Sequence, residues 1–153
     1  MPDELADIEA IRQLKARYFR TLDQKDWRGY RGVFTDDVVV DTTDDSGPGT
    51  EQEGADAYVA WLIPILSDAI TVHHGHMGEV VVTGPDTAWG IWSMEDHIWF
   101  PPGTGLGRLW GTGWYEEEYR RVGDEWRIAR LKLRRRRVEL DGTQVFPPPP
   151  PET

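Results

Sequence analysis

Three of the four histidines in this 153-residue chain lie close together, in the run TVHHGHMGEVVV over residues 71–82. The remainder of the run is rich in β-branched residues, which favours a β-strand. Because alternate side chains of a strand face opposite sides of a sheet, His73 faces one side while His74 and His76 face the other. This spacing argues against a three-histidine metal site. It favours a single imidazole, that of His73, projecting into the interior.

Asp23 is the best candidate for an acid that meets His73. Apolar residues recur at steps of three and four from Leu5 to Leu22, which predicts an amphipathic helix ending at about Leu22 or Asp23. The helix dipole disfavours a carboxylate at that end. Pairing with His73 would explain the position of Asp23, whereas a solvated turn is the simpler alternative.

Three further elements and one loop are predicted between this helix and the histidine run. Asp26 has the position of an N-cap for a short helix over residues 27–34. A run of valines predicts a strand over residues 38–42, and turn-forming residues predict an exposed loop over residues 44–54. Apolar residues at helical spacing predict another helix over residues 55–66.

Segments rich in β-branched and aromatic residues fill most of the chain after the third helix. Turn formers separate them, so consecutive segments should pair as an antiparallel meander, with the helices packed on one face in an α+β architecture. The four predicted strands cover residues 71–82, 87–100, 108–122 and 125–140. We expect one domain over residues 1–140, followed by a Pro-rich C-terminal tail over residues 141–153 that is extended and peripheral.

Composition excludes several classes of function. The formal charge is −10, so nucleic acid and anionic membrane surfaces should be repelled. The chain has no cysteine, which excludes disulfides, thiolate catalysis and cysteine-ligated metals. No apolar run reaches membrane-spanning length, and the N-terminal residues do not resemble a secretory leader. We therefore expect a cytoplasmic protein with neither nucleic acid nor membrane as a partner.

A run of four arginines, Arg134–Arg137, lies in the last predicted strand. Strand alternation divides these side chains between two faces, where stacking on tryptophan and cross-strand ion pairs can account for most of them. Antiparallel register also predicts that Glu117 lies near Arg130. Arg135 shares a face with apolar residues, so we expect it to face the interior and bind an anionic or carbonyl group of a ligand.

The pattern from about Glu4 to Leu140 resembles the SnoaL-like branch of the nuclear transport factor 2-like superfamily. The stretches that carry the resemblance are IEAIRQLKARYFRTLDQKDWRGYRGVFTDDVVVD, TVHHGHMGEVVVTGPDTAWGIWSMED and GWYEEEYRRVGDEWRIARLKLRRRRVE. The resemblance implies a cone-shaped, curved antiparallel or mixed sheet. It also implies that three N-terminal helices and this sheet enclose an apolar cavity.

The resemblance is strongest to scytalone dehydratase-like and bile-acid 7α-dehydratase-like members, which eliminate water through a His–Asp pair without a cofactor. It implies catalytic roles for Asp23 and His73, and for Tyr18, five residues before the aspartate. A further acid on the next strand falls on Asp96, with His97 adjacent as the alternative. Alternation favours Asp96, which shares its strand face with apolar residues. No metal or cofactor is implied.

These groups could form an acid–base site. His73 would remove a proton from a carbon next to a carbonyl, and Asp23 would fix its tautomer. Tyr18 would donate a hydrogen bond to developing negative charge, and Asp96 would orient the substrate or act as a second acid. The residues that we expect to bind the substrate and exclude water are Tyr58, Trp61, Trp92, Trp110, Trp114 and Arg135.

The first functional hypothesis is a cofactor-independent lyase, a dehydratase, or an isomerase that acts on a polycyclic, steroid-like or polyketide-like hydroxy-carbonyl compound. The same base could instead serve double-bond migration or an aldol-type cyclisation. Another class of function is a non-catalytic small-ligand-binding or dimerisation module. An epoxide hydrolase of this superfamily needs an Asp–Arg–Asp set, and the sequence shows no clear arginine between two aspartates. The resemblance also implies a homo-dimer or homo-trimer.

Overall fold

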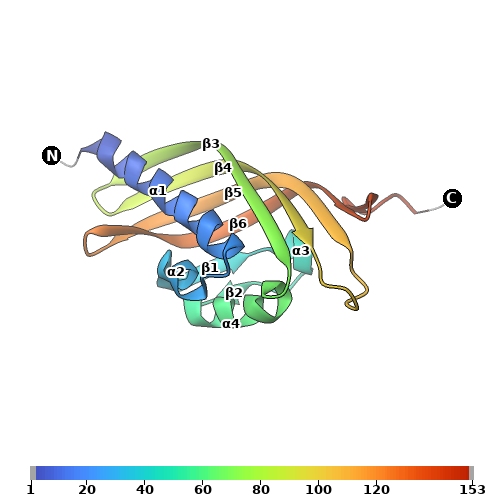
Figure 1. Ribbon diagram of the computed structural model, residues 1–153. Helices are drawn as coiled ribbons and strands as arrows, with labels where there is room; N and C mark the ends of the chain where they lie inside the picture. The colour runs from blue at the N-terminus through green and yellow to red at the C-terminus, as the bar shows by residue number, and fades with distance from the viewer. Residues whose placement is uncertain (1–2, 152–153) are drawn as a thin grey trace.

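A strongly curved sheet and a group of helices divide the molecule into two layers (Figure 1). The computed structural model describes residues 3–151. In this part of the chain the sheet has seven strands in the order β2-β1-β6-β5-β4-β3, with β7 paired to β6. This α+β architecture with a curved mixed sheet confirms the prediction from sequence. The strands are β1 (Phe34–Asp41), β2 (Gln52–Glu53), β3 (Ile70–Gly84), β4 (Thr87–Trp99), β5 (Arg108–Val122), β6 (Glu125–Leu140) and β7 (Thr143–Phe146).

Strands β3 to β6 form the predicted antiparallel meander, in which each strand pairs with the next one along the chain. Short connections between consecutive strands require this antiparallel pairing. Strand β1 joins the other side of β6 in parallel, and β2 pairs with β1 in antiparallel fashion. The long excursion of the chain between β1 and β6 permits the parallel pair.

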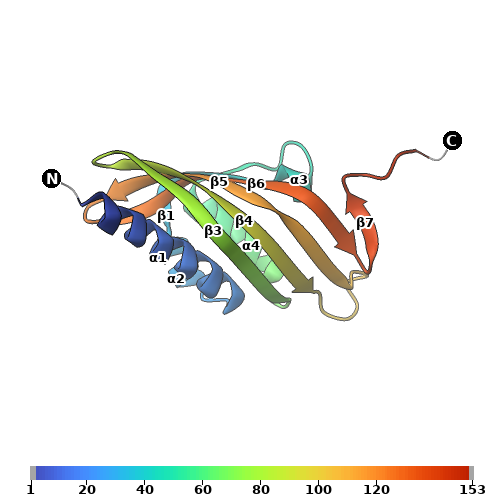
Figure 2. The ribbon, with the colours of Figure 1, turned by 90° about the horizontal axis from the view of Figure 1, so that it is seen from above.

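Helix α1 (Glu4–Asp23) packs along the inner face of the sheet, against β3 (Figure 2). Asp3 begins the helix, because its side chain accepts hydrogen bonds from two backbone N–H groups of the first turn. The helix ends where the sequence predicts, so the Asp23 carboxylate lies beside β3. Its buried stripe includes Ile11, Leu14, Tyr18 and Leu22.

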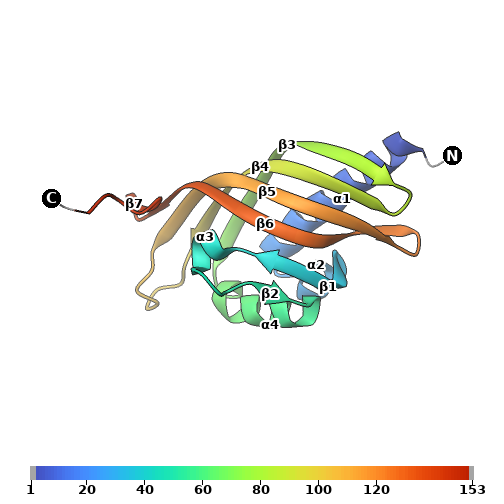
Figure 3. The same ribbon diagram turned by 180° about the vertical axis from the view of Figure 1, so that it is seen from behind.

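Two further helices cover the molecule on the side of β1 (Figure 3). Helix α2 (Trp27–Gly32) begins after the predicted N-cap Asp26, whose carboxylate accepts a backbone hydrogen bond at 2.9 Å. Helix α4 (Ala55–Leu66) packs against α2 and β1, and the hydroxyls of Tyr30 and Tyr58 lie 2.9 Å apart between the two helices. Within residues 3–151, no helix is long and apolar enough to cross a membrane.

The segment predicted as an exposed loop, residues 44–54, is partly regular. Helix α3 (Thr43–Ser46) is a single turn that opens this segment. Its start is fixed by Asp41, whose carboxylate accepts the Thr43 N–H at 3.1 Å and the Thr43 hydroxyl at 2.7 Å. The turn carries Asp44 and Asp45, and both carboxylates bind an arginine of β6. The loop prediction is wrong here because this long-range contact holds the turn against the sheet.

The C-terminal segment also differs from its prediction as an extended tail. Strand β7 pairs with the end of β6, so the sheet continues into residues 143–146. Exposed and partly buried residues alternate in this stretch, which suits an edge strand with one partner. The proline run follows directly after the strand.

An ion pair between Lys15 of α1 and Glu117 of β5 is buried between the two layers. The two residues are 1% and 3% exposed. Glu117 also accepts a hydrogen bond from the Tyr119 hydroxyl, which in turn accepts one from the Trp92 indole at 2.8 Å. Burial lowers the pKa of Lys15 to about 8, although Glu117 opposes this effect. The expected proximity of Glu117 and Arg130 is wrong, because the next residue along β5 occupies that register position.

Replacing one member of this pair should destabilise the fold far more than replacing both. Lys15→Met alone leaves the Glu117 carboxylate buried without its counter-charge, and Glu117→Gln alone leaves the Lys15 ammonium in the same state. Each single variant should lose about 3–5 kcal/mol of unfolding free energy. The double variant buries no net charge, so its loss should be well below the sum of the single losses. Urea unfolding of the four proteins measures the difference, and additive losses would contradict the role assigned to the pair.

Candidate active site

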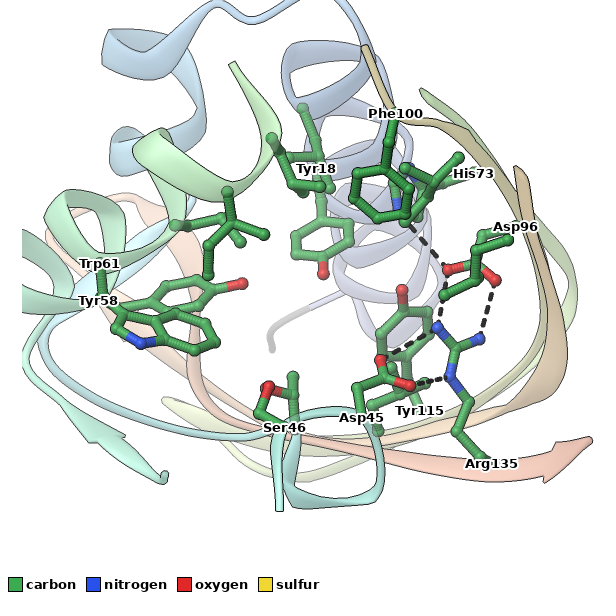
Figure 4. A pocket seen from close by; sticks show the side chains of 18 residues that line it. Tyr18, Asp45, Ser46, Tyr58, Trp61, His73, Asp96, Phe100, Tyr115 and Arg135 are labelled. Carbon is green, nitrogen blue, oxygen red and sulfur yellow. Dashed lines mark hydrogen bonds and ion pairs between the residues drawn. The ribbon is translucent and has the colours of Figure 1, made fainter. Parts of the chain in front are cut away.

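A cavity of about 220 Å³ lies between the helices and the inner face of the sheet (Figure 4). Aromatic and aliphatic side chains form most of its wall. On one side lie Tyr58 and Trp61 of α4, whose rings stack with their centroids 6.3 Å apart. On the other side lie ionisable groups from β3, β4 and β6. The cavity therefore combines an apolar wall with a polar one, as small-molecule sites do.

His73 and Asp23 are in contact at the wall of this cavity. The ring atom Nδ1 of His73 lies 2.7 Å from Asp23 Oδ1, and the backbone N–H of His73 donates to Oδ2 at 2.9 Å. Thr71 lies on the same face of β3 and donates its hydroxyl to Oδ1 at 2.9 Å. The Asp23 side chain is thus held at both oxygens, and the contact expected from sequence is present.

The protonation of this pair follows from its surroundings. Burial raises the pKa of Asp23, but hydrogen bonds from His73 and Thr71 outweigh burial and hold the pKa below its ordinary value of 3.8. Asp23 is therefore ionised at neutral pH and accepts a hydrogen bond from Nδ1–H. In the neutral imidazole the other ring atom, Nε2, carries the lone pair, and the ring lines the cavity. A neutral His73 in this arrangement can act as a base.

Asp96 lines the cavity from β4, the strand next to β3. His73 and Asp96 are register partners in β3 and β4, so their side chains share the inner face. Asp96 Oδ2 is 3.8 Å from His73 Nε2, and Asp96 is only 1% exposed. The sequence-based choice of Asp96 over His97 for the inner face is correct, because His97 lies on the opposite face and contacts Arg108 at 2.7 Å.

Arg135 lies between two aspartates on the inner face of the sheet. Its Nη1 and Nη2 atoms each donate to Asp96 at 2.8 Å, while Nε and Nη2 donate to Asp45 at 2.8 and 3.0 Å. The remaining Nη1 hydrogen points at the Met94 sulfur, 3.5 Å away. All five guanidinium N–H groups therefore have partners. Burial lowers the pKa of Arg135, but the two carboxylates outweigh it and keep the pKa above its ordinary value.

Two sequence-based expectations about this arginine need correction. Arg135 faces the interior as predicted. It has no free N–H group to bind an anion or carbonyl of a ligand, because its N–H groups already donate to Asp45, Asp96 and the Met94 sulfur. The Asp–Arg–Asp set that the sequence does not show is also present, as Asp45, Arg135 and Asp96. Asp45 was hidden because it lies in a segment that resembles an exposed loop. The acidic pair Asp44–Asp45, together with an inward arginine 90 residues later, is the only sequence signal for it.

Gly111 of β5 makes room for the ion pair. A Cβ atom at Gly111 would lie 2.5 Å from Arg135 Nη1 and 2.8 Å from Asp96 Oδ1. Both distances are shorter than real Cβ contacts, so any other residue would push the two side chains apart. The close approach of these two side chains therefore explains why a glycine stands at this position beside the candidate site.

Three phenol groups line the cavity, and all three remain protonated at neutral pH. Burial is the main cause that raises the pKa of Tyr18 and Tyr115 well above 10.0, and it raises that of Tyr58 to about 12. The hydroxyls of Tyr18 and Tyr115 point toward the centre of the cavity (Figure 4). The Lys15 ammonium lies 3.8 and 3.6 Å from the centroids of these two rings. A cation at the ring face favours negative charge on the phenol, which strengthens hydrogen-bond donation.

The aromatic residues expected to line the cavity fall into two groups. Tyr58 and Trp61 do line it. Trp110 and Trp114 do not, because they are register partners of His97 and Ser93 on the outer face of the sheet. Trp92 is on the inner face, but its indole is turned toward the hydroxyl of Tyr119 rather than into the cavity. The three incorrect placements are therefore Trp92, Trp110 and Trp114.

The other two histidines of the run lie outside. His74 and His76 both face Glu95 on the outer side of the sheet, at 3.8 and 3.7 Å. Arg136 stacks on Trp114 on the same face, with 5.7 Å between guanidinium and ring centroid. The predicted division of the histidine and arginine runs between two faces is correct, and only His73 and Arg135 of these runs line the cavity.

The SnoaL-like domain family matches the chain over residues 3–132. The chain belongs to this family. The match covers both elements that bring His73 and Asp23 together, α1 and β3.

Solved structures share the fold over most of their length. A protein from Kribbella flavida is 26% identical, with a TM-score of 0.81 over 90% of this chain and 95% of the other. A protein named as a scytalone dehydratase, from Novosphingobium aromaticivorans, is 20% identical, with a TM-score of 0.80 over 91% of each chain. A hexachlorocyclohexane dehydrochlorinase, LinA type 2, is 19% identical, with a TM-score of 0.77 over 95% of this chain and 97% of the other. These likenesses establish the fold.

The lowered pKa of Asp23 has a measurable consequence for stability. A carboxylate whose pKa is depressed on folding contributes stability above its unfolded pKa, and loses that contribution as pH falls through the folded value. The difference in unfolding free energy between the wild type and Asp23→Asn should therefore be larger at about pH 7 than at about pH 3. Chemical unfolding at both pH values measures it.

Asp124→Asn, in the exposed turn between β5 and β6, provides the control and should change little at either pH. A difference for Asp23→Asn that is independent of pH would show that the carboxylate is not stabilised by its contacts with β3.

Proposed function

We propose that this protein is a cofactor-independent lyase or isomerase that uses His73 as a base on a small cyclic carbonyl compound. The observation that carries the proposal is the contact of Nδ1 with ionised Asp23, which leaves Nε2 as an acceptor in an aromatic cavity. A non-catalytic binding or dimerisation module requires no such pair. The fold shared with a protein named as a scytalone dehydratase and with a dehydrochlorinase supports the same class of reaction.

The first step would be removal of a proton from the carbon next to the carbonyl. His73 Nε2 takes the proton, and the electron pair of the C–H bond moves into an enolate. Asp23 stabilises the imidazolium that forms, because its carboxylate already binds Nδ1–H. Asp96, 3.8 Å from Nε2, adds a second negative charge beside the imidazolium.

The second step would be loss of the hydroxyl group from the next carbon. The enolate electrons form the new double bond as the C–O bond breaks, and the imidazolium returns its proton to the departing hydroxide, which leaves as water. Tyr18 and Tyr115 would donate hydrogen bonds to the carbonyl oxygen throughout, since their hydroxyls point into the cavity. Return of the proton to a different carbon instead would give an isomerase.

The size of the cavity narrows the substrate. A protein cavity of about 150 Å³ holds one benzene, and sites for drug-sized molecules start at about 300 Å³. The volume of about 220 Å³ therefore suits a compound of one or two rings better than the four rings of a steroid. The stacked pair Tyr58 and Trp61 would contact the flat face of such a ring system.

Proton abstraction can be tested before the natural substrate is known. We expect the wild type to accelerate exchange of deuterium from D₂O into the α-carbons of 2-tetralone, a neutral two-ring ketone, followed by NMR. His73→Ala should lose about 100-fold or more of the exchange rate, and Asp23→Asn most of it. The companion probe 3-hydroxy-1-tetralone distinguishes a dehydratase, because loss of water from it yields 1-naphthol.

His74→Ala is the matched control, because this neighbouring histidine faces Glu95 on the outer side of the sheet. It should retain the wild-type exchange rate. An unchanged rate in folded His73→Ala would remove this residue from the mechanism.

A second candidate function, epoxide hydrolysis, is favoured by the position of Arg135 between Asp45 and Asp96. In that reaction the carboxylate of one aspartate would activate water, and the protonated carboxyl group of the other aspartate would protonate the epoxide oxygen. The geometry favours it less, because Arg135 already binds both oxygens of each carboxylate.

Styrene oxide separates the two candidates. We expect no enzymatic formation of its diol, measured by chromatography. Diol formation that Asp96→Asn abolishes and His73→Ala leaves intact would replace the first proposal with the second.

The predicted homo-dimer or homo-trimer is a separate proposal, which sedimentation analysis of the purified protein tests.

A further inference from the structure

The edge of Arg135 that faces the cavity is occupied by a side chain from a distant part of the chain. Asp45 and Arg135 both line the cavity, and the contact joins α3 to β6. Asp45 binds Nε and Nη2 with its two oxygens, at 2.8 and 3.0 Å. This is the two-point geometry in which a guanidinium also binds the carboxylate of a ligand. Asp45 thus occupies the place of a ligand carboxylate (Figure 4).

The two members of this contact differ in how firmly they are held. The Arg135 side chain is 2% exposed and is fixed from its other edge by Asp96. The Asp45 side chain is 28% exposed and belongs to the single turn α3. That turn has a separate attachment, because Asp44 accepts the backbone N–H of Arg135 at 2.8 Å. Removal of the Asp45 carboxylate would therefore free one edge of Arg135 and leave both α3 and the guanidinium attached.

The negative charge of the site also opposes the binding of an anionic ligand. Two carboxylates, Asp45 and Asp96, contact the Arg135 guanidinium, and a third, Asp23, contacts His73 and has Lys25 nearby. With a neutral His73, three carboxylates and two cations surround the site, which leaves it with one excess negative charge. A ligand anion in the cavity would be repelled at short range, where low dielectric makes the repulsion strong. The formal charge of −10 on the whole chain adds to this effect.

We propose that Asp45 is a specificity-determining residue, which makes the cavity selective for uncharged cyclic carbonyl and hydroxyl compounds by occupying the guanidinium edge that would otherwise bind a carboxylate. The inference rests on the proposed function in one respect, that the cavity is the substrate site. It adds the class of ligand that the site rejects, aromatic carboxylates of the same size as the neutral substrate. It predicts a gain of binding, which a merely structural role of Asp45 does not produce.

Two probes of similar size test the proposal, neutral 2-tetralone and anionic 2-naphthoate, with affinities measured by isothermal titration calorimetry. We expect the wild type to bind 2-naphthoate at least about tenfold more weakly than 2-tetralone. Asp45→Ala should bind 2-naphthoate at least about tenfold more tightly than the wild type does, since the ligand carboxylate replaces the missing one. Asp45→Asn, which keeps the shape and loses the charge, should gain less.

Asp44→Ala is the matched control, because Asp44 is adjacent in α3 but contacts only the Arg135 backbone. It should leave the affinity for both probes unchanged. The double variant Asp45→Ala with Arg135→Met should lose the gain, because the group that binds the carboxylate is then absent.

Failure of folded Asp45→Ala and Asp45→Asn to gain affinity for 2-naphthoate would overturn the proposal, as would equal binding of the two probes by the wild type. These outcomes are separate from the fate of the proposed function. A gain of 2-naphthoate binding without any proton exchange in 2-tetralone would retain the specificity role and reject the lyase. Proton exchange in 2-tetralone that depends on His73, without a gain of 2-naphthoate binding in the Asp45 variants, would retain the lyase and reject the specificity role.

Discussion

The contact between Asp23 and His73 determines both the chemistry and the closure of this site. The Asp23 carboxylate accepts three hydrogen bonds: from the backbone N–H of His73 in β3, from the ring of His73 and from the hydroxyl of Thr71. It therefore fixes the C-terminal end of α1 against the strand and directs Nε2 of the imidazole to the cavity at the same time. A carboxylate at the end of a helix opposes the helix dipole, and these three hydrogen bonds compensate for that position.

Negative charge is the second constraint on the site. Asp23 and Asp96 favour the imidazolium that proton removal would form, and Arg135 holds the Asp96 carboxyl group in place on the inner face. Asp45 completes the neutralisation of the arginine from the opposite edge. The result is a buried cluster that stabilises positive charge on His73 while rejecting anionic ligands. Gly111 permits the cluster, because a side chain there would overlap Arg135 and Asp96.

Periodicity made much of the fold and part of the site predictable from the sequence. The alternation of β3, β4 and β6 correctly placed His73, Asp96 and Arg135 on the inner face, and helical spacing correctly ended α1 at Asp23. Contacts between distant segments were beyond local patterns. Asp45 belongs to a stretch of turn formers, so nothing local shows that it meets Arg135, 90 residues later. Trp110 and Trp114 were misplaced because aromatic character alone does not distinguish a cavity wall from an outer sheet face.

A crystal structure of the protein with bound 2-tetralone would show directly whether His73 is the base of a carbonyl-directed reaction. We expect an α-carbon of the ketone within about 3.5 Å of His73 Nε2, with the Nδ1 contact to Asp23 retained. We also expect the ketone oxygen at hydrogen-bond distance, about 2.8 Å, from the hydroxyl of Tyr18 or Tyr115. A ketone bound with its α-carbons away from Nε2, or an imidazole turned away from Asp23, would contradict the role of His73 as the base.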